Sequence, residues 1–358
     1  MNLFDGRLRR EMTVDLIPVP FARLWGYLDR KANLAIPPRF TWAGEFSGGL
    51  ALVNEGGQPG FRDDIVGGKW GFIDPVGKYA FKDKFDDAAA FSEGLAVVNI
   101  GARAEYAAHE DGYYSTGGRF GYIDTTGKWL VQPRYSYALD MREGLAAVSS
   151  GNKTGYIDAT GKFAIEPNFD SGYLFREGYA VVRVGQEHGY IGKNGDFLIP
   201  PKFGVASSFS EGVAHGLIQE TYAYVFFDTT GAELFRAPEN TINVGNFSNG
   251  LCYSALGAVK RFNDGKLYPM GGSKNYGYLD RGGNWSIEPQ YDWVSDFSEG
   301  VAWVRVGDRQ HMYIKWGGEP LNGKFYDEAA SFRNGLALVR IGTRHALIDL
   351  NGSTFWEY

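Results

Sequence analysis

The sequence has little of what several protein classes require. Its 358 residues include one cysteine, which excludes an internal disulfide and disfavours a disulfide-stabilised secreted domain. No apolar run approaches the ~20 residues of a membrane span, and the first residues show no signal-peptide pattern. The net charge of −6 argues against a strongly basic surface for nucleic acid. These absences predict a cytoplasmic protein with neither a nucleic-acid nor a membrane partner.

Signals for helices and for common catalytic or metal sites are also missing. The five histidines are scattered without zinc-like spacing, and no glycine-rich phosphate loop precedes a helix pattern. We therefore expect no metal, no cofactor and no catalytic residues. What the chain has instead is 50 glycines and 16 % aromatic residues, which favour turns and strands.

A short phrase recurs along the chain and is clearest at Gly121-Tyr122-Ile123-Asp124, which is followed by Gly127-Lys128. It returns at Gly155 and again at Gly189, so the period is 34 residues in both steps. A fixed period of this size is typical of a repeat architecture, in which one array absorbs the full length. We count nine copies of this first half and eight of the second half.

Each copy reads as three short strands. Asp followed three residues later by Gly predicts a type I turn, since the carboxylate accepts backbone N–H groups and Gly tolerates positive φ. A proline and an aromatic residue follow, and then a Phe-Ser-Glu-Gly segment, as at 91–94, leads into a third strand. Because the acids recur at most equivalent positions, with Asp absent before Gly195 and Gly318, we interpret them as solutions to a repeated backbone problem and not as one active site.

The fold prediction is an all-β tandem array of about nine three-stranded antiparallel β-meander units. An open superhelix or solenoid is favoured, because 34 residues is short for a four-stranded propeller blade and nine units exceed the usual blade number. A closed propeller-like ring is the alternative. Residues 25–358 form the array as a single domain, and residues 1–24 serve as an N-terminal cap or a closing strand.

Three units are longer than the rest, with their excess near residues 54–69, 99–119 and 254–275. Insertions confined to one junction project from one face, which is often the binding face of a repeat array. Two inserts are rich in aromatic and charged residues, the types common as interface anchors. Long hairpins that merely extend the sheets are the simpler interpretation. The candidate binding residues are Tyr106, His109, Tyr113, Tyr114, Arg261, Phe262 and Tyr268.

The recurring phrase resembles a known bacterial family. Trp25-Gly26-Tyr27-Leu28-Asp29 and Lys69-Trp70-Gly71-Phe72-Ile73-Asp74 are similar to the WG (KWG) repeat, and the resemblance extends from Trp25 to Trp356. The tryptophan is kept twice, and other copies hold Phe120, Thr154, His188 or Tyr276 in its place. The resemblance implies an all-β repeat protein and brings no catalytic residues.

The leading functional hypothesis is a non-catalytic scaffold that binds a protein partner through its inserts. One version is a bacterial immunity or inhibitor protein that neutralises a basic toxin, for which a mildly acidic chain is suited. The alternative is a carbohydrate-binding repeat protein with exposed aromatic side chains, of which Trp293 and Trp303 are candidates. An enzyme with a site assembled across repeats is a third, less favoured class. The sequence leaves the oligomeric state open.

Overall fold

The computed structural model of the chain describes residues 15–59, 65–107, 112–261, 267–270, 275–307 and 310–358. These residues form strands and turns and no helix, so none of them belongs to a helix that is long and apolar enough to cross a membrane. The chain divides into two compact units, residues 1–168 and 169–358. The all-β repeat architecture expected from the sequence is confirmed.

The first unit contains four main antiparallel sheets. Their strands are β1 (Leu16–Phe21), β2 (Leu24–Asp29) and β3 (Leu34–Phe40); β4 (Trp42–Ser47), β5 (Leu50–Glu55) and β8 (Lys69–Ile73); β9 (Asp87–Ala88), β10 (Leu95–Ala107), β11 (Gly112–Asp124) and β12 (Trp129–Tyr135); and β13 (Leu145–Ser150), β14 (Lys153–Asp158) and β15 (Phe163–Phe169). A further pair, β6 (Gln58–Pro59) and β7 (Ile65–Val66), forms a small sheet of its own. Within the predicted N-terminal segment, β1 pairs with β2 over six positions and so belongs to the first sheet.

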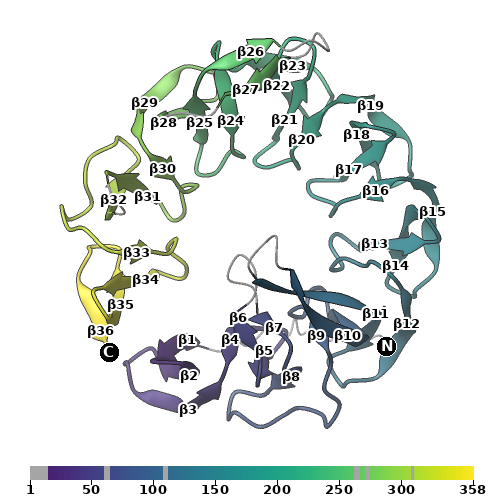
Figure 1. Cartoon of the computed structure of the whole chain (residues 1–358), viewed down its shortest axis with the longest axis vertical. Helices are drawn as coiled ribbons and strands as arrows, with labels where there is room; N and C mark the ends of the chain where they lie inside the picture. The colour runs from purple at the N-terminus through teal and green to yellow at the C-terminus, as the bar shows by residue number, and fades with distance from the viewer. Residues whose placement is uncertain (1–14, 60–64, 108–111, 262–266, 271–274, 308–309) are drawn as a thin grey trace, which may run out of the picture. The chain divides into compact units, whose positions relative to one another are not determined.

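The second unit contains five main sheets. Their strands are β16 (Ser171–Gly172), β17 (Tyr179–Val184), β18 (Glu187–Gly192) and β19 (Phe197–Phe203); β20 (Val205–Ala206), β21 (Val213–Ile218), β22 (Ala223–Asp228) and β23 (Glu233–Arg236); β24 (Thr241–Val244), β25 (Cys252–Leu256), β28 (Asn275–Leu279) and β29 (Trp285–Tyr291); β30 (Trp293–Val294), β31 (Val301–Val306) and β32 (Gln310–Lys315); and β33 (Glu328–Ala329), β34 (Leu336–Ile341), β35 (Arg344–Asp349) and β36 (Thr354–Glu357). The pair β26 (Val259–Arg261) and β27 (Leu267–Pro269) forms a separate small sheet. Figure 1 shows the strands of each sheet side by side, for example β16 to β19.

Sheet boundaries do not coincide with the sequence repeats. The strand that ends one copy of the repeat pairs with the strand that opens the next copy, as β13 does with β14. Each complete sheet therefore has a short first strand and a second strand from one copy, and a third and fourth strand from the next. The prediction of three-stranded units was incomplete because the first strand needs only two residues, as in β16 and β20. A four-stranded sheet thus fits within the repeat length.

Burial follows the position of a strand within its sheet. The second and third strands are buried along runs of four or more residues, as in β21 and β22 of the second unit, because the sheets before and after them in that unit cover both of their faces. The fourth strand alternates between buried and exposed residues, as in β12, which shows that only one of its faces is covered. The core is therefore repeated between consecutive sheets, as expected for an array whose units stack on their neighbours.

In five sheets, the tyrosine of the Gly-Tyr-Ile-Asp phrase links the sheet to the next part of the chain. Tyr122 is fully buried, and its hydroxyl donates to the carbonyl oxygen of Leu139 at 2.7 Å. The same bond spans the same 17 residues at Tyr27, Tyr190, Tyr278 and Tyr313. Burial raises the pKa of these phenols far above its ordinary value. The tyrosine is kept in the repeat because it fills the core and satisfies a backbone acceptor.

Candidate interaction surface

Every main sheet has two ends with different loops. One end, which we call the turn edge, carries the turn between the third and fourth strands, in most sheets Asp-x-x-Gly, and the turn before the second strand, which in several sheets reads Ser-Glu-Gly. The other end, which we call the insert edge, carries the hairpin that joins the second and third strands. This follows from the register, in which Leu95 at the start of β10 faces Asp124 at the end of β11. All three inserts lie in hairpins of the insert edge.

The aspartates of the turn edge are turn caps, as expected from the sequence. Asp124 Oδ1 accepts the backbone N–H of Thr126 at 2.9 Å and that of Lys128 at 3.0 Å. Gly127 closes the turn with φ of +81°, a conformation that strongly favours glycine. Hydrogen bonds, led by that of the Thr126 hydroxyl, hold the pKa of the Asp124 carboxyl below its ordinary value. The carboxylate is occupied by its own loop and is not arranged for catalysis.

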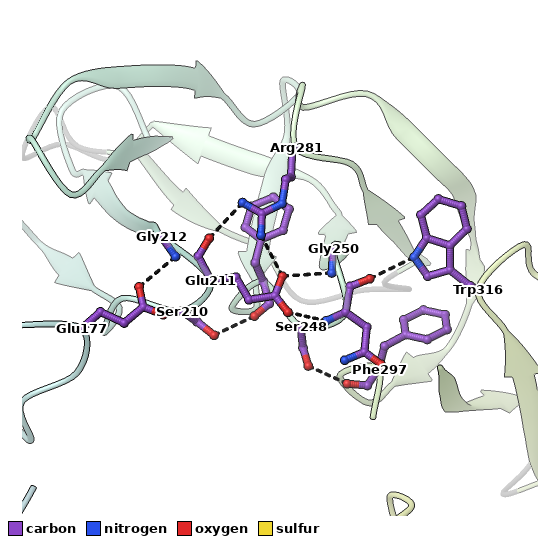
Figure 2. A network of polar contacts seen from close by, with 11 residues as sticks. Glu177, Ser210, Glu211, Gly212, Ser248, Gly250, Arg281, Phe297 and Trp316 are labelled. Carbon is purple, nitrogen blue, oxygen red and sulfur yellow. Dashed lines mark hydrogen bonds and ion pairs between the residues drawn. The ribbon is translucent and has the colours of Figure 1, made fainter. Parts of the chain in front are cut away.

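The glutamates of the turn edge link successive sheets, which the sequence analysis did not foresee. Glu211 has φ of +53°, an uncommon conformation for a residue other than glycine, asparagine or aspartate. Its carboxylate accepts the backbone N–H groups of Asn249 at 2.7 Å and Gly250 at 3.0 Å, in the turn of the next sheet (Figure 2). Arg281 Nη2 lies 2.9 Å from the same carboxylate. Glu211 therefore caps a neighbouring turn instead of its own.

This arrangement recurs along both units. Glu93 caps the turn at 143–144, the Glu177 carboxylate accepts the backbone N–H of Gly212, and that of Glu299 accepts the N–H of Gly335. The preceding serines add a parallel row, since the hydroxyls of Ser210 and Ser248 donate to the carbonyl oxygens of Phe247 and Phe297 (Figure 2). The polar groups of this edge are largely engaged in holding sheets together.

The insert edge is capped by different residues. In three sheets without an insert, an aspartate after the fourth-strand aromatic accepts the N–H of the hairpin glycine, as Asp170 does for Gly185 at 2.7 Å. Asp292 and Asp327 do the same for Gly307 and Gly342. Asp86 does the same for Gly101 at the base of the β10–β11 hairpin. Where an insert is present, the hairpin grows outward. In the sheet of β9 to β12 it becomes the 13-residue strands β10 and β11 (Figure 1).

Two asparagines at the bases of inserts are further residues that the sequence analysis missed. Asn54 is fully buried, its Nδ2 donates to Gly67 O at 3.1 Å, and its Oδ1 accepts the N–H of Gly57 at 3.0 Å. Asn99 occupies the same register position in the next sheet, opposite Phe120 as Asn54 is opposite Trp70. A Cβ on Gly68 or Gly118 would lie within 3 Å of the asparagine amide oxygen. An Asn at the end of the second strand with Gly-Gly before the next strand is the signal that could have found these bases.

The candidate binding residues fall on two of the inserts. In the β10–β11 hairpin, Tyr106 pairs with Tyr113, and Tyr114 pairs with Glu105. Arg261 ends β26 opposite Leu267, and Tyr268, in β27, pairs with Lys260 and is 38 % exposed. His109 and Phe262 lie outside the described residues. The structure thus places the described candidates on the insert edge in two groups, one in each unit. The insert hairpins do extend the sheets or form small sheets beside them.

The remaining candidate chemistry belongs to the core. His311 packs edge-on against Trp303, with ring centroids 5.2 Å apart, and His188 lies near Tyr173, so both are flat, partly buried side chains that pack beside an aromatic ring. Cys252 is fully buried, and this burial raises the pKa of its thiol far above the ordinary range. The thiol donates a hydrogen bond to the carbonyl oxygen of Gly245. Within the described ranges, no three His, Cys, Asp or Glu residues are grouped as metal ligands.

The family model for the WG containing repeat matches residues 25–58, 70–102, 120–153, 155–186, 189–214, 276–309 and 326–342, which together cover more than half of the chain. The chain belongs to the WG-repeat family. The family model does not match residues 215–275, yet β22, β24 and β25 continue the same sheet plan there. The irregular part of the array is thus built on the same plan as the rest.

One solved structure shares the fold over most of the chain, and a second aligns over a similar length. A crystal structure of a eukaryotic initiation factor is similar with a TM-score of 0.52 at 10 % identity, covering 95 % of this chain and 94 % of that one. BamB from Moraxella catarrhalis aligns with a TM-score of 0.41 at 11 % identity, covering 96 % and 93 %. A search of curated protein sequences finds no match. At these identities the similarity concerns the fold alone.

Proposed function

We propose that the chain is a non-catalytic scaffold that binds a protein partner through the insert edge. The observation that carries this proposal is the contrast between the two edges. On the turn edge, the recurring aspartates cap their own turns, and the glutamates and serines are engaged in bonds to the next sheet. On the insert edge, regular hairpins are replaced at three places by longer segments that contain aromatic and charged residues. A rigid array with variable loops on one side is a common arrangement for recognition.

Site-specific photo-crosslinking tests the assignment of the edges. A photoreactive amino acid is introduced at Tyr114 or Tyr268 on the inserts, and at Val76 or Trp316 on the turn edge, which are 72 % and 53 % exposed. Irradiation in the native cells is expected to give a discrete cross-linked species from the insert positions and none from the turn-edge positions. Cross-links only from Val76 or Trp316 would show that the partner binds the turn edge and would contradict the proposal.

The immunity hypothesis is a more specific version of this proposal. It is motivated by the mild negative charge, which suits a basic enzyme as partner. The cross-linked partner is then a toxin whose activity falls when the purified chain is added at equimolar concentration. A partner with no enzymatic activity, or one that stays fully active in the complex, would reject this version and leave the scaffold proposal standing.

Carbohydrate binding remains the second hypothesis, and one residue favours it. Trp293 is 42 % exposed and its ring lies 5.0 Å from that of Tyr276, so its free face is available for stacking on a sugar ring. Trp303 is less suited because it packs on His311. Titration with oligosaccharides is expected to quench tryptophan fluorescence if this hypothesis holds, and the Trp293→Ala variant should abolish the change.

For the arrangement of the sheets we propose the closed, propeller-like ring, in place of the open superhelix favoured from the sequence. The supporting observation is the shape of a single sheet: its first strand has two residues, as in β16, and its fourth strand has seven, as in β19. Wedge-shaped, twisted sheets packed face to face curve toward their short strands. Small-angle scattering should give a radius of gyration near the ~21 Å of a compact chain of this length. A much larger, elongated particle would support the open superhelix.

A further inference from the structure

A groove in the first unit lies between β12 and the sheet of β13 to β15. Its volume is about 750 Å³, within the range of small-molecule sites. Arg119, Arg134 and Lys162 line it, together with the rings of Tyr135 and Phe163, and Glu166 is the carboxylate among its lining residues. Three cations beside a single lining carboxylate are notable on a chain whose net charge is −6.

The three cations have no carboxylate partner within 4 Å in the part of the chain that the structure describes. Arg134 Nη2 donates to the Tyr135 hydroxyl at 2.6 Å, and the guanidinium lies 4.8 Å from the centre of the Tyr135 ring. Arg119 Nη1 donates to the carbonyl oxygen of Gly118 at 2.9 Å. Neutral acceptors fix both guanidinium groups without cancelling their charge. Lys162 is near enough to Asp158 to contribute to the lowered pKa of that carboxyl, which Thr160 chiefly causes.

The preceding pair of sheets provides an internal comparison. There the same three positions hold Lys69, Lys84 and Lys128, so the cationic pattern is repeated. Two of these lysines are neutralised, because Lys69 pairs with Asp86 and Lys84 pairs with Glu55 at 2.7 Å.

The groove lacks both of those carboxylates. Ser136 stands where the preceding junction has Asp86, directly after the fourth-strand aromatic residue. In the preceding junction, Glu55 pairs across the strands with Lys69. At the groove, the equivalent partner of Arg119 is Ile100, which has no charge. The groove therefore keeps the cations of the repeat and has lost the acids that would balance them.

We propose that this groove binds a small organic anion, whose phosphate or carboxylate group is held by Arg119, Arg134 and Lys162. The guanidinium fork matches the oxygens of either group, and the lysine adds a point charge. Phe163, which also lines the groove and is only partly buried, offers an apolar contact for the rest of the ligand. The negative net charge of the chain disfavours a large polyanion such as nucleic acid, but it acts weakly beyond about one Debye length, ~8 Å in physiological salt. This site is separate from the insert-edge proposal and does not depend on it.

Calorimetric titration of the full chain tests the site with two probes, pyrophosphate and citrate. Saturable binding of at least one probe at a single site is expected, and the tighter probe identifies the preferred oxyanion. The Ser136→Asp variant restores the carboxylate of the preceding junction and should weaken binding about tenfold or more, as should Lys162→Gln. The Ser136→Asn variant introduces a side chain of nearly the same size as aspartate but without its charge, and it should bind the probe as the parent chain does.

Two further results decide the outcome. Lys128→Gln, at the equivalent position of the neutralised junction, should leave binding unchanged. The proposal is overturned if neither probe binds at millimolar concentration, if Ser136→Asp binds as tightly as Ser136→Asn, or if Lys128→Gln weakens binding as much as Lys162→Gln does. Circular dichroism of each variant confirms that the sheets are retained.

Discussion

Removing the Glu211 carboxylate tests whether the turn edge holds consecutive sheets together. The carboxylate accepts two backbone N–H groups, from Asn249 and Gly250, and lies 2.9 Å from Arg281. A hydrogen bond to a charged group contributes about 1.5–3 kcal/mol when shielded from water. Because the Glu211 side chain is 32 % exposed and that of Arg281 is 51 % exposed, we reduce each backbone bond to about 1 kcal/mol and assign the ion pair little.

The Glu211→Ala variant should therefore destabilise the turn at 248–251 by about 2 kcal/mol, which corresponds to roughly 30-fold faster amide exchange by local opening. Hydrogen–deuterium exchange with mass spectrometry resolves this, because the effect is confined to peptides that contain Asn249 and Gly250. Global unfolding is less informative, since a repeat array does not unfold as a single unit.

Two companion variants sharpen the result. Glu220→Ala removes an exposed glutamate from the opposite edge of the same sheet and should leave exchange at 248–251 unchanged. Glu211→Asn should be milder than the alanine variant, because asparagine tolerates positive φ and Asn249 itself uses its Oδ1 to accept the N–H of Gly300. Less than about threefold acceleration in Glu211→Ala would refute the view that these glutamates stabilise the neighbouring turn.

Two other predictions concern the core. Tyr122→Phe leaves the Leu139 carbonyl without its donor and should cost about 1–3 kcal/mol, read as faster exchange near residues 137–141. His215 is buried, and burial lowers its pKa from 6.5 to about 4, so the unfolded chain binds a proton that the folded chain does not. The free energy of unfolding therefore has its full value above pH ~6.5. It falls by on the order of 3 kcal/mol toward pH ~4, because protonation favours the unfolded chain. His215→Leu should remove that part of the pH dependence of the local opening free energy of β21, measured by hydrogen exchange corrected for intrinsic rates, and an unchanged pH profile would contradict it.

The repeat could be predicted because its local rules agree with the fold. The Asp124 and Gly127 pair specifies a turn through its own chemistry, and the alternation of Tyr, Ile and Val specifies strands. The position of the inserts was also visible as extra length at one junction.

The pairing of strands could not be predicted in the same way. Sequence similarity marks where a pattern restarts, but hydrogen bonding joins β13 to β14 across that point. The two-residue strand β16 has no periodicity to detect. The role of Glu211 depends on a turn 38 residues away, and the charge of the groove depends on what is missing at Ser136 and Ile100. Such features become visible only when the sheets are placed beside each other.

Replacement of the inserts tests the central claim, that the insert edge and not the turn edge binds the partner. The strand register gives the cut sites. In the hairpin without an insert, Ser150 pairs with Lys153 across a two-residue turn. The equivalent pairs at the bases of the two inserts are Ile100 with Arg119 and Leu256 with Asn275. Residues 101–118 and 257–274 are replaced by Gly-Asn, the turn at 151–152, with Asn99→Ser added to match Ser149.

This shortened chain and the Glu211→Ala chain are compared for quantitative capture of the partner identified by cross-linking. The account predicts that the shortened chain keeps its β-sheet circular dichroism and loses capture, while Glu211→Ala retains it. Full capture by the folded, shortened chain would contradict the account.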